Sequence, residues 1–213
     1  MRPGLNIGGP SNDKPGAMNR RRSSATEIAM VKNYEKAVGE SSEWRTPKAL
    51  LDAIGLTYAV DPCAPLDGYY AVQAEVRFTM RDNGLLRPWP PGLAFVNPPW
   101  SETRRAVVPW LKRWNAHDGG GIFVCVARTS ADWFQEFALP HSDQVCFPAS
   151  KTRFNKPDGS PGSEPTNGVA ILARGEVAVE ALRKSGLGHC LFVDRSATPS
   201  PRIAKLNSLA ERG

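Results

Sequence analysis

The hydrophobic positions of this chain form short apolar runs separated by amphipathic stretches. The run at residues 122–127 is apolar throughout, which is typical of a central strand covered on both faces. Similar runs predict further strands at 58–60, 93–96, 145–147 and 168–173. Because these strands alternate with helical segments, the pattern predicts an α/β sheet with flanking helices.

Helices are expected between the apolar runs. Thr46 is a candidate helix cap with Pro47 in the first helical position, and apolar residues follow at helical spacing until Gly55 ends the pattern. Three more helices are predicted at 102–114, 130–137 and 176–184. Pro109 falls inside the first of these and is expected to bend it.

Composition divides the chain into three parts. Residues 1–42 are rich in Gly, Pro, Asn, Ser and Arg without periodicity, which predicts a disordered or loosely attached basic segment. Residues 43–194 are expected to form the folded domain, and residues 195–213 a tail; a 213-residue chain that is 41% hydrophobic can bury one substantial core. Half of the net charge of +6 lies in the first 40 residues, where seven basic residues outnumber four acidic ones. Such a segment is a solvated tail or an arm that meets phosphates.

The most informative motif is Asn97-Pro98-Pro99-Trp100, which follows an apolar strand. The two prolines end the strand and lack backbone donors, so their carbonyls stay available as acceptors. The Asn97 side-chain oxygen and the Pro98 carbonyl can each accept one hydrogen of a planar NH2 group, while Trp100 can stack on the ring that carries it. The alternative is a proline-terminated strand with a core tryptophan. Asp61 ends an earlier strand, and ligands of open α/β sheets bind at such carboxyl ends.

The cysteines and the apolar content limit the class of protein. Cys63, Cys125, Cys146 and Cys190 lie far apart without a C-x-x-C pair, which indicates neither a zinc site nor a disulfide framework. No metal site is therefore predicted. No stretch approaches the roughly 18 apolar residues of a membrane span, and the start of the chain lacks the apolar core of a signal peptide. These features predict a soluble, cytoplasmic protein.

Four motifs in sequence order resemble the phage-type DNA adenine-N6 methyltransferase family (Dam-like). They are Trp44-Arg45-Thr46-Pro47, Asp61-Pro62-Cys63-Ala64, residues 82–89 and Asn97-Pro98-Pro99-Trp100-Ser101. The resemblance extends over residues 43–173. It implies a Rossmann-like methyltransferase sheet, S-adenosylmethionine as methyl donor, and methylation of the exocyclic amine of adenine in DNA. It also implies a setting in phage or restriction–modification biology, in the bacterial host cytoplasm if the gene is carried by a phage, and leaves the oligomeric state open.

The same resemblance assigns roles to individual residues. The catalytic motif falls on Asn97, Pro98, Pro99 and Trp100. The cofactor-side motifs fall on Trp44, Thr46, Pro47, Asp61 and Pro62, with Asp82 as a second candidate carboxylate. For Asp61 and Asp82 the alternative is a turn-forming role.

Two features of the chain depart from the family pattern. Trp100 stands where the family commonly has tyrosine, and a tryptophan there also resembles some cytosine-N4 methyltransferases. No G-x-G-x-x-G loop follows the first strand. Methylation of cytosine N4, of an RNA base or of a protein glutamine therefore stays an alternative, as does an inactive DNA-binding module on the same scaffold.

A DNA substrate requires a surface that binds phosphates. The candidates are Lys151, Arg153 and Lys156 in a Pro/Gly-rich loop at 148–166, and Arg104 and Arg105 just beyond the motif. Loops of this length in a compact domain are functional or disordered.

Overall fold

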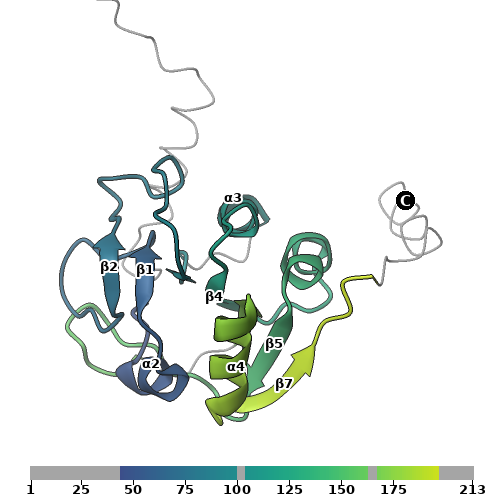
Figure 1. The fold of residues 1–213 in the computed structure, drawn as a ribbon. Helices are drawn as coiled ribbons and strands as arrows, with labels where there is room; N and C mark the ends of the chain where they lie inside the picture. Colours follow the sequence, from purple (N-terminus) through teal and green to yellow (C-terminus); the bar gives the residue numbers. More distant parts are fainter. Residues whose placement is uncertain (1–43, 100–103, 163–166, 197–213) are drawn as a thin grey trace, which may run out of the picture.

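A computed structural model describes residues 44–99, 104–162 and 167–196 of the chain (Figure 1). The predicted basic segment at 1–42 and Trp100 of the motif lie outside the described residues, as does the chain from 197 onward. The division into a 43–194 domain with flanking segments therefore stays a prediction.

The described residues contain one seven-stranded sheet with the order β2-β1-β3-β4-β6-β5-β7. Its strands are β1 (Tyr58–Asp61), β2 (Ala74–Arg77), β3 (Ala94–Val96), β4 (Gly121–Val126), β5 (Gln144–Pro148), β6 (Val169–Arg174) and β7 (Gly188–Phe192). The first four strands in the sheet order are parallel. β6 runs antiparallel to both β4 and β5, and β7 runs antiparallel to β5. The predicted α/β sheet is confirmed, with a mixed rather than purely parallel arrangement.

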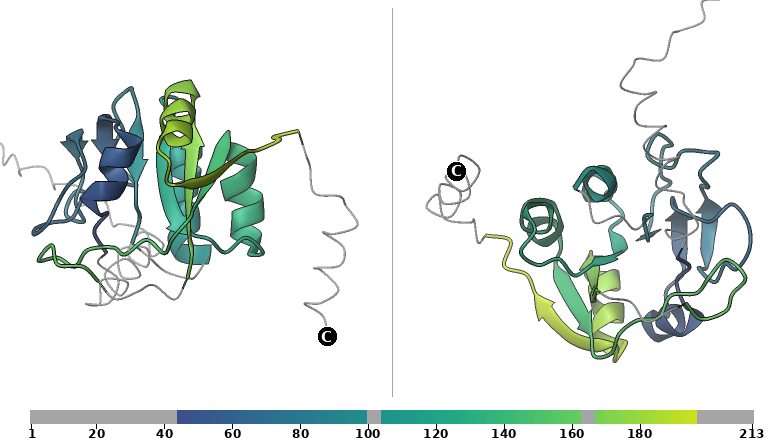
Figure 2. Two further views of the ribbon diagram at one scale, coloured as in Figure 1. Left: turned by 90° about the horizontal axis from the view of Figure 1, so that it is seen from below. Right: turned by 180° about the vertical axis from the view of Figure 1, so that it is seen from behind.

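Helices cover both faces of the sheet (Figures 1 and 2). On one face lie α2 (Lys48–Ile54) and α4 (Glu176–Lys184); on the other lie α3 (Arg104–Asn115) and the π-helical turn η1 (Phe134–Ala138), which continues into a 3-10 turn, η2 (Leu139–His141). Each face has its own apolar core, because successive residues of a strand point to opposite sides. All six residues of β4 are buried, as its continuous apolar run predicts.

The sequence pattern located most of these elements. The five predicted strands and four predicted helices are present, with boundaries shifted by a few residues, and Gly55 ends α2 with a left-handed backbone at φ 68°. β2 and β7 were missed. Both strands lie at an edge of the sheet, and their residues are half-buried or exposed. β2 alternates apolar and polar residues, whereas the apolar run at 190–193 overlaps β7 but was not interpreted as a strand.

One helix boundary differs from expectation. α2 begins at Lys48 with Pro47 in the capping position, and no side chain caps it, so the prediction that Thr46 caps this helix was wrong. His117, in the turn that follows α3, is buried, and its Nε2 lies 2.7 Å from the Gly92 carbonyl oxygen. Within the described ranges, no helix combines the length and apolarity needed to cross a membrane.

The strand order defines where a ligand can bind. From β1 the chain passes to β2 on one side, and it then returns to place β3 on the other side of β1. The connections therefore diverge between β1 and β3, which is the topological switch point of the sheet. In open α/β sheets a crevice forms there, outside the carboxyl ends of the strands. Asp61 is the last residue of β1 and Asn97 follows β3, so both predicted residues lie at this crevice.

Candidate active site

A pocket opens at the carboxyl ends of β1 and β3, with about 330 Å³ of empty space that is partly open to solvent. Three segments form its walls: the chain entering α2, the turn after β1 with the loop that leads to β2, and the end of β3. The lining residues are Trp44, Arg45, Thr46, Asp61, Cys63, Pro65, Tyr69, Tyr70, Ala71, Val72, Phe95 and Asn97. The pocket thus brings together four of the residues that the sequence assigned to the site: Trp44, Thr46, Asp61 and Asn97.

Asp61 supplies a buried carboxylate to this pocket. Its side chain is only 3% exposed, and its Oδ1 accepts a hydrogen bond from the Cys63 backbone N–H at 2.9 Å. Burial raises the pKa of Asp61 to about 7, although the Cys63 N–H, the Tyr70 hydroxyl and the Arg77 charge all act to lower it. A buried carboxylate at a switch point with this pKa can change its charge when a cationic group binds beside it.

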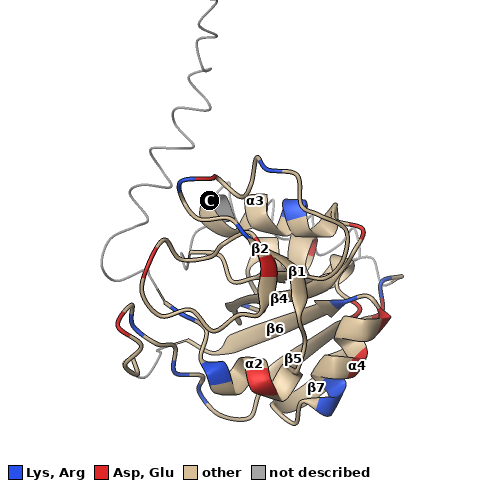
Figure 3. Cartoon of the chain, turned by 60° about the vertical axis from the view of Figure 1, so that its left-hand side comes forward, with Lys and Arg blue, Asp and Glu red and all other residues tan. Residues whose placement is uncertain are grey.

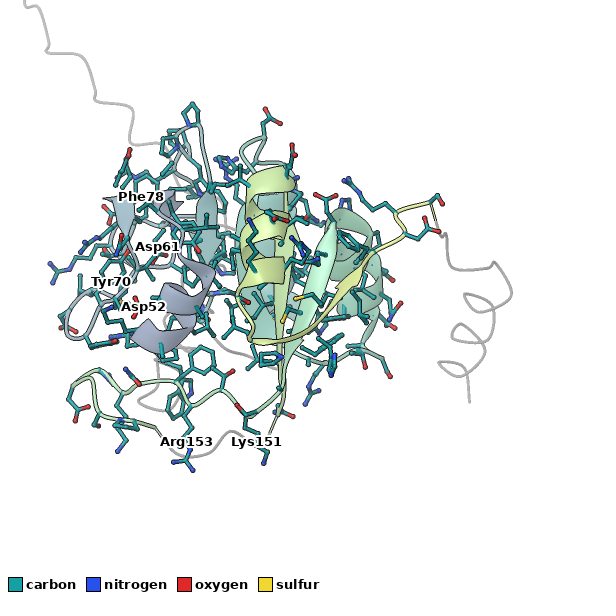
Figure 4. The ribbon with its side chains drawn as sticks, turned by 60° about the horizontal axis from the view of Figure 1, so that its bottom comes forward. Asp52, Asp61, Tyr70, Phe78, Lys151 and Arg153 are labelled. Carbon is teal, nitrogen blue, oxygen red and sulfur yellow. The ribbon has the colours of Figure 1, made fainter. Side chains whose placement is uncertain are left out.

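Tyr70 lies beside Asp61 in Figure 4, and its ring carries the Arg77 guanidinium 4.0 Å from the ring centroid. Burial and the Asp61 charge raise the pKa of Tyr70, so it is a neutral hydrogen-bond donor. The buried Tyr70 hydroxyl acts on the pKa of Asp61 but makes no hydrogen bond of normal geometry within the described residues.

Asn97 is held in one orientation by the segment that precedes α2. Its Nδ2 donates to the Thr46 hydroxyl oxygen at 3.0 Å and to the Trp44 carbonyl oxygen at 3.4 Å. Thr46 is 6% exposed, and instead of capping α2 it serves as an acceptor for this amide. Because Nδ2 contacts both of these acceptors, the Asn97 Oδ1 faces away from Thr46. The amide oxygen is therefore pre-oriented before any substrate binds.

The other motif residues surround the pocket without lining it. Pro98 is buried and Pro99 is half-buried directly after Asn97. Pro47 occupies the capping position of α2, and Pro62 is buried in the turn after Asp61.

Asp82 lies outside the pocket lining. Its carboxylate accepts hydrogen bonds from the Thr79 backbone N–H at 2.9 Å and from the Thr79 hydroxyl at 2.8 Å. These bonds hold the pKa of Asp82 below its ordinary value. Asp82 thus stabilises a turn, the alternative role that the sequence left open for it.

The predicted basic residues divide into two groups. Lys151, Arg153 and Lys156 are exposed on the loop that connects β5 to β6, and Lys151 and Arg153 point away from the body of the protein (Figures 3 and 4). Arg104 and Arg105 begin α3, but their side chains lie outside what the structure describes.

The β5–β6 loop runs along the edge of the sheet that holds the pocket (Figure 2, left). Asn155 forms an antiparallel bridge with Arg45, with N···O distances of 2.8 and 2.9 Å, and the Tyr69 N–H donates to the Pro157 carbonyl at 2.8 Å. A Cβ atom on Gly162 would lie 2.3 Å from the Trp44 ring, so only glycine allows this close approach. The loop is therefore packed against two pocket walls and carries its basic residues on an anchored backbone.

Sequence reasoning missed Arg45, Tyr69 and Tyr70 as pocket residues. Two weak sequence signals pointed to these residues: Arg45 lies inside the Trp44–Pro47 motif, and Tyr69-Tyr70 is an aromatic pair in a loop. Neither signal could show which way the side chains point.

Comparison with known proteins was made at three levels. A family model described as DNA N-6-adenine-methyltransferase (Dam) matches residues 33–174, which is more than half of the chain and includes the pocket and the Asn97 motif. No curated protein and no solved structure matched. The chain therefore belongs to the DNA N-6-adenine-methyltransferase (Dam) family and is an enzyme that methylates the N6 amine of adenine in DNA.

Proposed function

We propose that the pocket at the ends of β1 and β3 binds S-adenosylmethionine, the methyl donor that the family implies, and that Asn97 and Pro98 hold the adenine amine beside it. The observation that carries this proposal is the pre-oriented Asn97 amide next to the buried Asp61 carboxylate. On this view the mixed sheet is a Rossmann-like methyltransferase sheet, with the ligand at the switch point between β1 and β3.

The residues of the pocket fit this donor. S-adenosylmethionine carries an ammonium group and ribose hydroxyls, and Asp61 offers a buried carboxylate to either. The neutral Tyr70 hydroxyl lies beside that carboxylate, and Trp44 and Tyr69 offer aromatic faces. When bound, the donor supplies an electrophilic methyl group on a sulfonium.

The chemistry of the acceptor amine explains the motif. The lone pair of an aromatic amine is delocalised into the ring, which makes the nitrogen a poor nucleophile. If the Asn97 Oδ1 and the Pro98 carbonyl each accept one amine hydrogen, the nitrogen becomes more tetrahedral and its lone pair is directed outward. Positioning of this kind lowers the activation free energy of methyl transfer, and it does so without a strong base. The surplus amine proton then passes to solvent.

Access to the amine requires that adenine leave the base stack of the duplex. We assign Trp100 the role of a stacking surface for the displaced base, with Pro99 stiffening the backbone between Asn97 and Trp100. A stacking contact of this kind contributes roughly 1–3 kcal/mol per base, which offsets part of the unstacking energy.

Filling the pocket is expected to block the donor. Ala71 lines the pocket, so Ala71→Trp should weaken S-adenosylmethionine binding by at least about tenfold in a calorimetric titration, because the indole occupies the ligand volume. Leu86→Trp is the matched control, because Leu86 is 72% exposed. A folded Ala71→Trp protein with wild-type affinity would show that the donor binds elsewhere.

The reaction is measured with labelled S-adenosylmethionine and duplex DNA, followed by nucleoside analysis. N6-methyladenine is the expected product. N4-methylcytosine alone would overturn the choice of base but leave the amine-activating geometry intact. No modified base in DNA or RNA would contradict the proposal as a whole.

The β5–β6 loop is assigned to the DNA backbone, together with Arg104 and Arg105. Neutralising Lys151, Arg153 or Lys156 with glutamine is expected to weaken binding to all duplex sequences alike and to reduce the salt dependence of binding by about one charge per residue. Arg195→Gln is the matched control, because Arg195 pairs with Asp143 at the opposite edge of the sheet. An unchanged salt dependence in all three loop variants would remove the loop from the DNA surface.

A further inference from the structure

Two of the four cysteines face each other at one edge of the sheet, away from the pocket. Cys146 on β5 is the register partner of Cys190 on β7, and Figure 1 shows these two strands side by side. Directly opposed residues of antiparallel strands point to the same face. Cys146 is buried in the core that α2 and α4 cover, and the half-buried Cys190 packs against the same core. About 44 positions separate the two cysteines along the chain, so their spacing did not indicate a pair.

The backbone hydrogen bonds show that this pair belongs to the closely spaced kind. Hydrogen-bonded and non-hydrogen-bonded positions alternate along antiparallel strands, and the side chains are closer at the non-hydrogen-bonded positions. The Val193 N–H donates to the Asp143 carbonyl at 3.0 Å, so this flanking pair is hydrogen-bonded. Three positions further along β5, Cys146 and Cys190 therefore form a non-hydrogen-bonded pair. Pro148, which has no N–H to donate, occupies a position of the same kind.

Non-hydrogen-bonded pairs have Cα atoms about 4.5 Å apart, which lies within the range of about 4.4–6.8 Å that disulfides span. The two thiols are also in contact: burial raises the pKa of Cys146 to about 12, and a hydrogen bond with the Cys190 thiol acts in the same direction. Cys190 is the more accessible of the two, because it lies on an edge strand beside Leu191 and Phe192, which are 55% and 72% exposed. A reagent in solution therefore reaches Cys190 first.

We infer that Cys146 and Cys190 form a reversible disulfide that fastens β7 to β5, with a low-molecular-weight disulfide such as oxidised glutathione as the oxidant. The Cys190 thiolate attacks one sulfur of the oxidant, a mixed disulfide forms, and one glutathione thiolate leaves. The Cys146 sulfur then attacks the Cys190 Sγ and displaces the second glutathione. The two protein thiols are oxidised to one disulfide, one glutathione disulfide is reduced to two thiols, and the protons of the protein thiols are transferred to the departing glutathione.

The disulfide has a consequence for the fold. It closes a loop of the chain that contains the basic β5–β6 loop, β6 and α4. A crosslink of this kind stabilises a protein mainly by restricting the unfolded chain, and more so for a long loop than for a short one. It also fastens the outermost strand of the sheet, which has β5 as its one neighbouring strand among the described residues. Oxidation is therefore expected to make the folded protein more resistant to heat.

The test treats the folded full-length chain with oxidised glutathione at pH 8 and then blocks the remaining thiols. Trypsin leaves each of the four cysteines on a different peptide, so mass spectrometry should show peptide 129–151 joined to peptide 185–195. Two of the four thiols should be lost, and dithiothreitol should restore them. The midpoint of thermal unfolding should be at least about 5 °C higher for the oxidised protein than for the reduced protein.

Two variants locate the effect. Cys190→Ala should lose both the linked peptide and the shift of the midpoint. Cys125→Ala is the matched control and should behave as wild type, because Cys125 lies on β4 opposite Ala170, in the core of the other face.

Three results would contradict the inference: four free thiols after treatment, a reaction that stops at the mixed disulfide on Cys190, or a disulfide between other cysteines. A linked peptide without a rise of the midpoint would show that the bond does not fasten β7, and would overturn the inference as well. Oxidised and reduced wild type are compared directly, so these results decide the question even if a variant does not fold.

Discussion

Asp61→Asn is expected to weaken S-adenosylmethionine binding by at least about tenfold and, at the same time, to stabilise the folded protein at pH 8. Both effects come from the buried carboxylate, which is 3% exposed and has its pKa raised to about 7 by burial. The amide removes the charge that the ligand needs and the charge that burial disfavours. It keeps an oxygen that can accept the Cys63 N–H.

The sign of the stability effect follows from proton binding. The unfolded chain loses the Asp61 proton near pH 4, whereas the folded protein keeps it until about pH 7. Across this window the folded state binds more protons, so the stability of the protein falls as the pH rises, and the loss is complete above pH 7. Within this window the free energy of unfolding falls by up to about 1.4 kcal/mol per pH unit. Asp61→Asn should therefore raise the free energy of unfolding at pH 8 by at least about 1 kcal/mol and have little effect near pH 4.

Ligand binding has the opposite dependence on pH. If Asp61 meets the ammonium group of the donor, binding requires the ionised carboxylate, so the affinity of wild type should rise by up to tenfold per pH unit toward pH 7 and level off above it. Asp61→Asn should lack this rise. Denaturant melts and calorimetry at pH 5 and pH 8 measure both effects. Asp52→Asn is the matched control, because the side chain of Asp52 is 53% exposed and pairs with Lys48 on α2 (Figure 4). Equal stability of wild type and Asp61→Asn at pH 8, or unchanged ligand affinity, would make Asp61 a turn residue.

Asn97→Ala is expected to lower turnover by about a hundredfold or more, because the variant loses the acceptor that orients the adenine amine. S-adenosylmethionine affinity should change by no more than a few-fold, since the amide acts on the acceptor and not on the donor. Single-turnover methylation measures the first effect, and calorimetry measures the second.

The contacts of Asn97 provide a second variant that separates orientation from chemistry. Thr46→Val removes the oxygen that receives the Asn97 Nδ2 at 3.0 Å but leaves the Asn97 carbonyl in place. This variant should lose less activity than Asn97→Ala, because the Trp44 carbonyl still holds the amide. Full activity in Asn97→Ala would exclude Asn97 from the mechanism. A loss in Thr46→Val as large as in Asn97→Ala would show that Thr46 has a role beyond orientation.

The sequence predicted the elements whose signals are local. The continuous apolar run at 122–127 predicted β4, which is buried along its whole length. Helical spacing and Gly55 predicted α2, and the Asn97 motif follows an apolar run that predicted β3. The edge strand β2 was missed because its exposed positions are charged and its apolar positions are isolated, and the edge strand β7 was missed although the apolar run at 190–193 overlaps it. The sequence pattern placed Thr46 at a helix cap, because no local pattern reveals its contact with Asn97, which lies 51 positions further along the chain.

By itself, the sequence determined the alternation of strands and helices, the order of the motifs and the residue types at the strand ends. These depend on short-range periodicity and on the restricted backbone of proline and glycine. Only the tertiary structure decided that β3 lies beside β1, that Asp61 is buried enough to titrate near pH 7, and that Arg45 and Tyr70 belong to the same pocket. Strand order, desolvation and side-chain direction arise when distant segments pack together, so no local pattern contains them.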